Sequence, residues 1–299
     1  MPDANIRQFC VNFFIIFEMI ADLKCGKLKM KEIFQTFKPK NSIVRKYVDY
    51  YYLDIKPNNV INEFLCFPHF NNTISIYRYH VRLENGEIKF DDNAKPLQIF
   101  TPIREKVLNV KQSGTVHRIV IVFHPLGIQQ FYENLNFAGY ITDYEFFNPD
   151  ELKELFSTAQ TEFIADFLDN ALLHRFRKFE NKILEQAIQY IFSNDEKISV
   201  KELSTYIGIS RQHLNRVFQF NLGVSIKKFH EIVLFRQSVN KKLFENPESS
   251  FTEIAYEFNF SDQSHLNKIY KNLVDNSPRI FFSKGTILGK EDTFWHLKS

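Results

Sequence analysis

A repeated segment in the last third of the chain limits its fold more than any other feature. Residues 200–218 read VKELSTYIGISRQHLNRVF, and residues 251–270 read FTEIAYEFNFSDQSHLNKIY. The two stretches align at an offset of 51 residues, which becomes 52 after one added residue in the second copy. After that point HLNRVF is matched by HLNKIY, with conservative changes only. Self-similarity of this kind predicts one supersecondary unit that occurs twice.

Each copy begins with a helix-start signal. Ser199 and Glu202 have the spacing of a capping box, and so do Ser250 and Glu253. In such a box the serine side chain accepts from the backbone of the first turn while the glutamate reaches back to the serine N–H. The sequence therefore predicts a helix beginning at each of these serines.

Turn chemistry follows each of these helices. Gly208 lies where a tight turn requires positive φ, which glycine adopts at no steric cost. The second copy has Asn259 there, the next best residue for a left-handed conformation. Ser210 can cap a second helix in the first copy, as Ser261 or Asp262 can in the second. Each copy is therefore predicted to be a helix-turn-helix unit.

The second helix of each unit combines an apolar stripe with an outer face that holds no acidic residue. Arginine pairs well with guanine, asparagine and glutamine with adenine, and lysine with phosphate, so these faces suit DNA. An ordinary helix pair with a polar exterior is the alternative, although such a face more often includes acids. The outward residues are Arg211, Gln212, Asn215, Arg216 and Gln219 in the first unit, and Gln263, Ser264, Asn267, Lys268 and Lys271 in the second.

Residues 226–245 are predicted to form one helix between the two units. Twenty residues span roughly 30 Å at about 1.5 Å per residue, and successive major grooves on one face of DNA lie about 34 Å apart. Lysines near the helix ends are candidate phosphate contacts, although a solvated lysine face is an equally good interpretation of each one. These lysines are Lys227, Lys228, Lys241 and Lys242.

The first half of the chain has a different pattern. Residues 30–148 are predicted to form a strand-rich α+β domain, with β-branched and aromatic runs at 47–53, 73–83 and 116–123. Asn85-Gly86 predicts a two-residue hairpin turn, and the pattern becomes helical after Gly127. Residues 149–180 are predicted to be a helical connector, 181–285 an all-α domain and 286–299 a tail, with helices only from 181 onward.

Residues 1–29 are predicted to be a poorly integrated extension. Residues 10–21 are apolar but too short to span a bilayer as a helix. Met30 opens a more ordinary N-terminus, so an over-extended start is our hypothesis. A buried N-terminal helix is the alternative.

Composition argues against several other classes of protein. The net charge is +3; residues 1–180 hold 22 basic and 22 acidic residues, and residues 181–299 hold 16 and 13. Cys10, Cys25 and Cys66 are isolated, which fits a reducing cytoplasm and neither a disulfide framework nor a zinc site. No hydrolase, metalloprotease or nucleotide-binding motif occurs. We therefore predict no catalytic residue, metal or cofactor.

The C-terminal motifs resemble one known family. Residues 253–255 (EIA), 259–266 (NFSDQSHL), 270–271 (YK) and 277–278 (SP) are similar to the most recognisable stretch of the AraC/XylS transcription regulators. The resemblance covers residues 181–285 strongly and the strand-rich part faintly. The family's usual glycine is Asn259 here, and a further glycine is replaced around Asp275-Asn276. These departures put the DNA affinity of the second unit in doubt.

The resemblance implies a regulator whose two recognition helices enter adjacent major grooves of double-stranded DNA. It further implies activation through RNA polymerase, and an N-terminal domain that senses a small molecule, forms a homodimer, or does both. A protein-interaction module that has lost DNA binding and an N-terminal enzyme with a DNA-targeting tail are the alternatives. By matching positions, the base-reading residues would be Gln212, Asn215, Arg216, Gln263, Ser264 and Lys268. The backbone or supporting residues would be Arg211, Gln219, Asn267, Lys271, Lys227 and Lys228.

Overall fold

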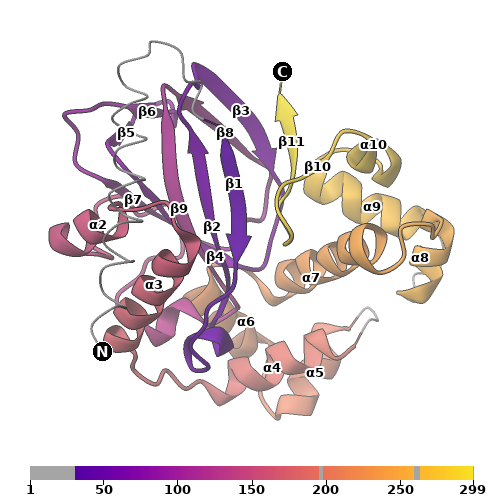
Figure 1. Cartoon of the computed structure of the whole chain (residues 1–299). Helices are drawn as coiled ribbons and strands as arrows, with labels where there is room; N and C mark the ends of the chain where they lie inside the picture. The colour runs from indigo at the N-terminus through magenta and orange to yellow at the C-terminus, as the bar shows by residue number, and fades with distance from the viewer. Residues whose placement is uncertain (1–30, 195–197, 259–262, 299) are drawn as a thin grey trace, which may run out of the picture.

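A computed structural model describes residues 31–194, 198–258 and 263–298 of the chain. The predicted extension at 1–29, the turn residue Asn259 and the candidate caps Ser261 and Asp262 lie outside the described residues. Figure 1 shows strands at the centre, two helices against them on one side, and a larger group of helices on the other. The prediction of a strand-rich N-terminal part and a helical C-terminal part is confirmed.

Within the described residues, the first sheet contains five strands in the order β1-β2-β9-β4-β7. All of its neighbouring strands are antiparallel. Its central strands β2 and β9 are buried on both faces, which explains their nearly continuous runs of tyrosine, valine and isoleucine. The strands are β1 (Ile33–Phe37), β2 (Val48–Lys56), β4 (Asn72–Tyr77), β7 (Leu97–Thr101) and β9 (Val116–Phe123).

One face of this sheet is covered by helices. Side chains alternate along a strand, so Tyr51 and Leu53 of β2 point to one face while Tyr50 and Tyr52 point to the other. The first face packs on α2 (Pro149–Leu155) and α3 (Thr161–Arg175), which form the predicted helical connector. The Tyr51 hydroxyl donates to Asp169 of α3 at 2.8 Å, which satisfies a buried carboxylate.

A second sheet lies against the other face and has the order β10-β11-β3-β8-β6-β5. The predicted hairpin around Gly86 joins β5 and β6, and Gly86 has a φ of +82°. Its loop is longer than the predicted two residues, because the ladder ends at the pair Arg82 and Ile88. The strands are β3 (Ile61–Cys66), β5 (His80–Arg82), β6 (Ile88–Phe90), β8 (Leu108–Ser113), β10 (Thr286–Ile287) and β11 (Phe294–Lys298).

The helical part forms its own hydrophobic core around α7. This helix is the most buried of the part, with Phe229, Val233 and Phe235 fully inside. It continues without a break into a wider helical turn, η3 (Lys241–Glu245), so the predicted helix over 226–245 is confirmed. The helices are α4 (Lys182–Phe192), α5 (Val200–Ile207), α6 (Arg211–Leu222), α7 (Ile226–Asn240), α8 (Phe251–Glu257), α9 (Gln263–Val274) and α10 (Pro278–Ser283).

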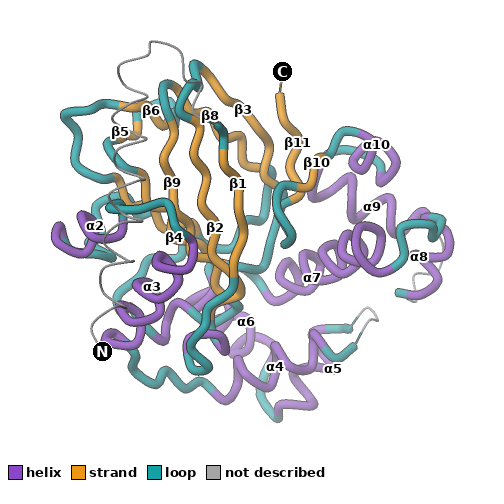
Figure 2. The backbone as a smooth tube through the Cα atoms, viewed as in Figure 1, coloured by secondary structure: helices purple, strands orange, loops and turns teal. Residues whose placement is uncertain are grey.

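Two sequence expectations are wrong. Residues 286–287 and 294–298 form strands β10 and β11, and β11 pairs with β3 of the N-terminal part, so the helical pattern does not continue through these residues. Figure 2 shows this orange strand returning to the sheets after the purple helices. The helical pattern after Gly127 yields only the short 3-10 turn η2 (Ile128–Gln130) before α2, and a similar turn, η1 (Val44–Lys46), precedes β2. The segment between η2 and α2 forms loops, and its aromatic residues Phe131, Tyr132, Phe146 and Phe147 pack into the hydrophobic core beside the first sheet.

Candidate DNA-binding interface

The first unit, α5 and α6, has the local geometry of a helix-turn-helix. The Ser199 side chain accepts from the Glu202 N–H, and the Glu202 carboxylate accepts from the Ser199 N–H, which completes the capping box. Gly208 has a φ of +79° and ends α5. Ser210 then caps α6 by accepting from the His213 N–H at 3.2 Å. Ser199, Glu202, Gly208 and Ser210 therefore have the capping and turn roles that the sequence predicts for them.

The outer face of α6 is open to solvent. Leu214 and Phe218 are fully buried against the core, whereas Arg211, Gln212, Asn215 and Arg216 are exposed. Arg211, Gln212 and Asn215 line a shallow groove together with Lys227, the second residue of α7. The fold thus brings the start of the connecting helix beside the recognition helix.

Two of the predicted supporting residues on α6 and α7 have partners inside the protein. The Gln219 side chain donates to the Gly223 carbonyl oxygen at 2.8 Å and so closes the end of α6. The Lys228 ammonium is half-buried and lies 2.7 Å from the Glu231 carboxylate. Of the two neighbouring lysines, Lys227 is therefore the one with an exposed side chain.

The second unit, α8 and α9, repeats the first. Ser250 and Glu253 form the second capping box, and Leu266, Ile269 and Tyr270 are buried. Gln263 opens α9. On the outer face Ser264 and Lys268 are exposed and Asn267 is half-buried, while Lys271 is exposed and pairs with Asp275.

The core of the helical part holds the two units together. Lys268 of α9 and Lys227 of α7 line one cavity of about 250 Å³ between the units.

Lys241 pairs with Glu257 and Glu245, and Lys242 donates to the carbonyl oxygens of Pro247 and Ser249. These two lysines therefore connect η3 to the segments around α8.

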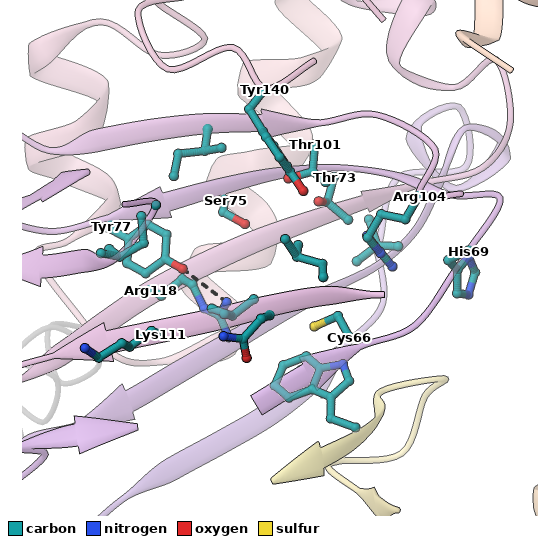
Figure 3. A pocket seen from close by; sticks show the side chains of 18 of the residues that line it. Cys66, His69, Thr73, Ser75, Tyr77, Thr101, Arg104, Lys111, Arg118 and Tyr140 are labelled. Atoms are coloured by element: carbon teal, nitrogen blue, oxygen red, sulfur yellow. Dashed lines mark hydrogen bonds between the residues drawn. The ribbon is translucent and has the colours of Figure 1, made fainter. Parts of the chain in front are cut away.

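The N-terminal part contains a cavity of about 350 Å³ between its two sheets, which the sequence pattern did not predict. Figure 3 shows Thr73, Ser75 and Thr101 directed into it from one side and Arg104 near its end. Polar residues at alternate positions of β4 were the available signal, because they place hydroxyls on a face that faces another sheet.

One member of a buried ion pair, Arg118, forms part of the wall of this cavity. The Arg118 guanidinium lies 2.8 Å from the Asp54 carboxylate and donates to the Tyr77 hydroxyl. Both side chains of the ion pair are almost fully buried. The Cys66 thiol lines the cavity as well, and burial raises its pKa. This thiol is therefore protonated at neutral pH, as a small apolar group would require.

A second buried ionic cluster joins the sheets to the helical part. Arg236 of α7 donates to Asp292 at 3.0 Å and to the carbonyl oxygens of Pro68 and Phe67 at 2.6 and 3.0 Å. Burial opposes ionisation of Asp292, yet the Arg236 guanidinium keeps its pKa well below the ordinary range. Burial and the same guanidinium lower the pKa of His69 to about 4.

No group of side chains suited to a metal ion occurs in the part of the chain that the structure describes. Within the same residues, no helix is both long and apolar enough to cross a membrane. Residues 1–30, where the apolar run lies, are not among them.

Helix-turn-helix units are DNA-binding elements, and the C-terminal part of this chain has two of them joined by one long buried helix. Residues 203–284 match the family described as "Helix-turn-helix domain", an AraC-type model that covers this C-terminal region only. The resemblance stated from the sequence is therefore confirmed for this region. A search with the whole sequence finds no curated protein that matches it.

Solved structures that match this chain include a transcriptional regulator and ToxT. An AraC-type regulator from Chromobacterium violaceum is 25% identical, with a TM-score of 0.29 over 33% of this chain and 87% of that one. ToxT from Vibrio cholerae is 11% identical, with a TM-score of 0.46 over 85% of this chain and 98% of that one. ToxT with an unsaturated fatty acid bound is 11% identical, with a TM-score of 0.42 over 81% and 98%.

Proposed function

We propose that this protein is a sequence-specific transcription regulator that inserts α6 and α9 into successive major grooves of one DNA face. One observation carries the proposal: the two helices occupy equivalent places in two repeated units, and neither contains an acidic residue. The helix between them is about 30 Å long by its residue count. That length suits the spacing of about 34 Å between successive major grooves.

Base reading is assigned to the exposed outer positions of the two helices. Arg216 has a guanidinium that suits the O6 and N7 atoms of guanine, and Gln212 and Asn215 have amides that suit adenine. Ser264 and Lys268 are exposed at the corresponding places on α9. Gln263 completes the set as the first residue of that helix.

Phosphate contact is assigned chiefly to Arg211 and Lys227. They line the same shallow groove, next to the capped starts of α6 and α7. Backbone N–H groups at a helix start favour an anion, and nearby cations strengthen that preference. Gln219, Asn267, Lys271 and Lys228 remain supporting positions in this proposal.

We assign the cavity between the sheets to a small-molecule effector. Its volume of about 350 Å³ is within the ordinary range for a ligand pocket. Arg82 and Arg104 line it, and neither pairs with a carboxylate among the described residues. The family resemblance extends the proposal to activation through RNA polymerase and to a homodimer formed by the N-terminal part.

Selection from a random pool of duplexes tests the proposal and identifies the binding site in the same experiment. The full-length protein is incubated with the pool at low salt, and the retained DNA is sequenced. We expect two enriched blocks whose centres lie about 10 base pairs apart. A variant carrying both Arg216→Ala and Lys268→Ala is the control and should enrich the site poorly. If the natural protein enriches no sequence, the proposal is wrong and an interaction module becomes the better account.

A further inference from the structure

Strand β11 contributes side chains to both halves of the molecule. Phe294 packs against Phe281 of α10 with the ring centroids 5.1 Å apart, and the His296 Nε2 atom lies 2.7 Å from the Phe281 carbonyl oxygen. Trp295, between them, stacks on Phe64 of β3 with the centroids 4.5 Å apart. Side chains alternate along a strand, so one face of β11 belongs to the helical core and the other to the sheets.

Trp295 forms part of the wall of the cavity between the sheets. It is buried among Tyr52, Phe64 and Phe34, and the Arg118 guanidinium lies 5.7 Å from its ring. A molecule that fills the cavity therefore contacts β11 through this indole.

Asp292, two residues before the strand, holds the helix between the two DNA-reading units. Its Oδ1 atom accepts from Arg236 of α7 at 3.0 Å, and its Oδ2 atom lies 3.1 Å from the His69 Nε2 atom. The Arg236 side chain is only 4% exposed. A buried guanidinium that loses its carboxylate partner is strongly destabilised, so the Asp292 carboxylate is one of the contacts that fix the position of α7.

We propose that residues 292–296 couple the occupancy of the cavity to the position of α7, and through α7 to the two recognition helices. The inference rests on the effector site assigned above, because it takes that cavity as the place where a ligand binds. A ligand that fits the cavity better when Trp295 is displaced favours a state in which Asp292 no longer holds Arg236. Such a ligand shifts the population between the two states by its difference in affinity for them.

Hydrogen exchange of the DNA-free, full-length protein tests the coupling directly. Trp295→Ala changes the cavity wall, and Asp292→Asn removes the charge that holds Arg236. We expect both variants to speed the exchange of the backbone amides of α7 by tenfold or more. We expect the amides of α3, which packs on the far face of the first sheet, to exchange at the natural rate.

Glu291→Gln is the matched control. Glu291 is a carboxylate on the same segment, but it pairs with Lys38 of the N-terminal part at 2.8 Å. Glu291→Gln should leave the hydrogen exchange of α7 unchanged. If this variant speeds the exchange of α7 as much as Asp292→Asn does, the proposal is overturned. Trp295→Phe, which keeps an aromatic ring, is measured beside Trp295→Ala so that a folded variant is available. Trp295→Phe should speed the hydrogen exchange of α7 less than Trp295→Ala does.

The proposal is overturned if the Trp295 variants speed exchange only in β3 and β11 while α7 keeps its natural protection. It is overturned as well if α3 and α7 are accelerated equally, because that result indicates global loosening. Since no DNA is present, failure here is independent of whether the protein enriches an operator.

Discussion

Phe294 and Trp295 are neighbours on one strand, yet their side chains enter two different hydrophobic cores. Phe294 lies among aromatic rings of α10, and Trp295 lies between the two sheets. Strand β11 is therefore a structural element shared by the helical part and the sheets.

The first prediction concerns the strand itself. Phe294→Ala removes a ring that is 3% exposed, so it should destabilise the protein by about 3–5 kcal/mol. Leu297→Ala, three residues further on at a position that is 46% exposed, is the control and should cost much less. Urea unfolding measures both. Equal and small effects would mean that the C-terminal strand is dispensable for stability.

The second prediction concerns the turn of the first unit. Gly208 has a φ of +79° with open space around it, so Gly208→Ala adds only backbone strain, about 1–2 kcal/mol. Gly208→Asn should cost less, because asparagine tolerates this conformation. Gly139 is equally open but does not have positive φ, so Gly139→Ala should be nearly neutral. Thermal unfolding of the three variants checks the order.

The third prediction is a loss of stability in mild acid. His69 Nδ1 accepts from the Asn71 N–H, so the neutral ring donates from Nε2 to Asp292. Its pKa is lowered to about 4 from an ordinary 6.5, so below pH 6.5 the unfolded chain takes up a proton that the folded chain refuses. Stability should therefore fall between pH 6.5 and 4, by about 3 kcal/mol for this histidine.

His117, with a pKa also lowered to about 4 by burial, adds to the same loss. Urea unfolding at several pH values measures the slope, and His69→Asn should make it shallower by about one proton. An unchanged slope would show that His69 titrates normally in the folded protein.

The fourth prediction separates two adjacent lysines. Lys227→Ala should weaken binding to all DNA sequences alike and reduce the slope of log affinity against log salt by about 1. Lys228→Ala should change that slope less, because its ammonium already pairs with Glu231. Titrations at four salt concentrations give both slopes. A larger change from Lys228→Ala would reverse the assignment.

The fifth prediction concerns base reading. Arg216→Ala should cost about 1–3 kcal/mol of operator affinity and relax the preference at one base pair. Lys46→Ala removes an equal charge from an exposed site in the N-terminal part and should leave that preference intact. Binding to the selected site and to its single-base variants provides the test. Uniform weakening on every sequence would assign Arg216 to phosphate instead.

Local signals made the helix-turn-helix units predictable from the sequence. Capping boxes at Ser199 and Ser250, and the glycine at 208, act through residues within four positions of one another, so pattern and structure agree. The two-part fold was predictable for the same reason, since strand and helix periodicities differ.

Long-range pairing explains what the sequence did not reveal. The pairing of β11 with β3 joins residues more than 230 positions apart, such as Lys298 and Glu63, and no local pattern specifies such a partner. The Arg236–Asp292 pair and the cavity depend on that pairing. The sequence pattern indicates only an ordinary cation on a helix at Arg236, and the fold shows that this side chain is buried.

Guanine methylation protection on the selected operator shows which major grooves α6 and α9 occupy, because the reagent attacks N7 in the major groove. We expect two protected blocks on one face, about 10 base pairs apart, with Arg216→Ala losing protection in one block and Lys268→Ala in the other. If instead a single block is protected and both variants remove that protection, α6 and α9 do not read separate grooves and the proposed function is wrong.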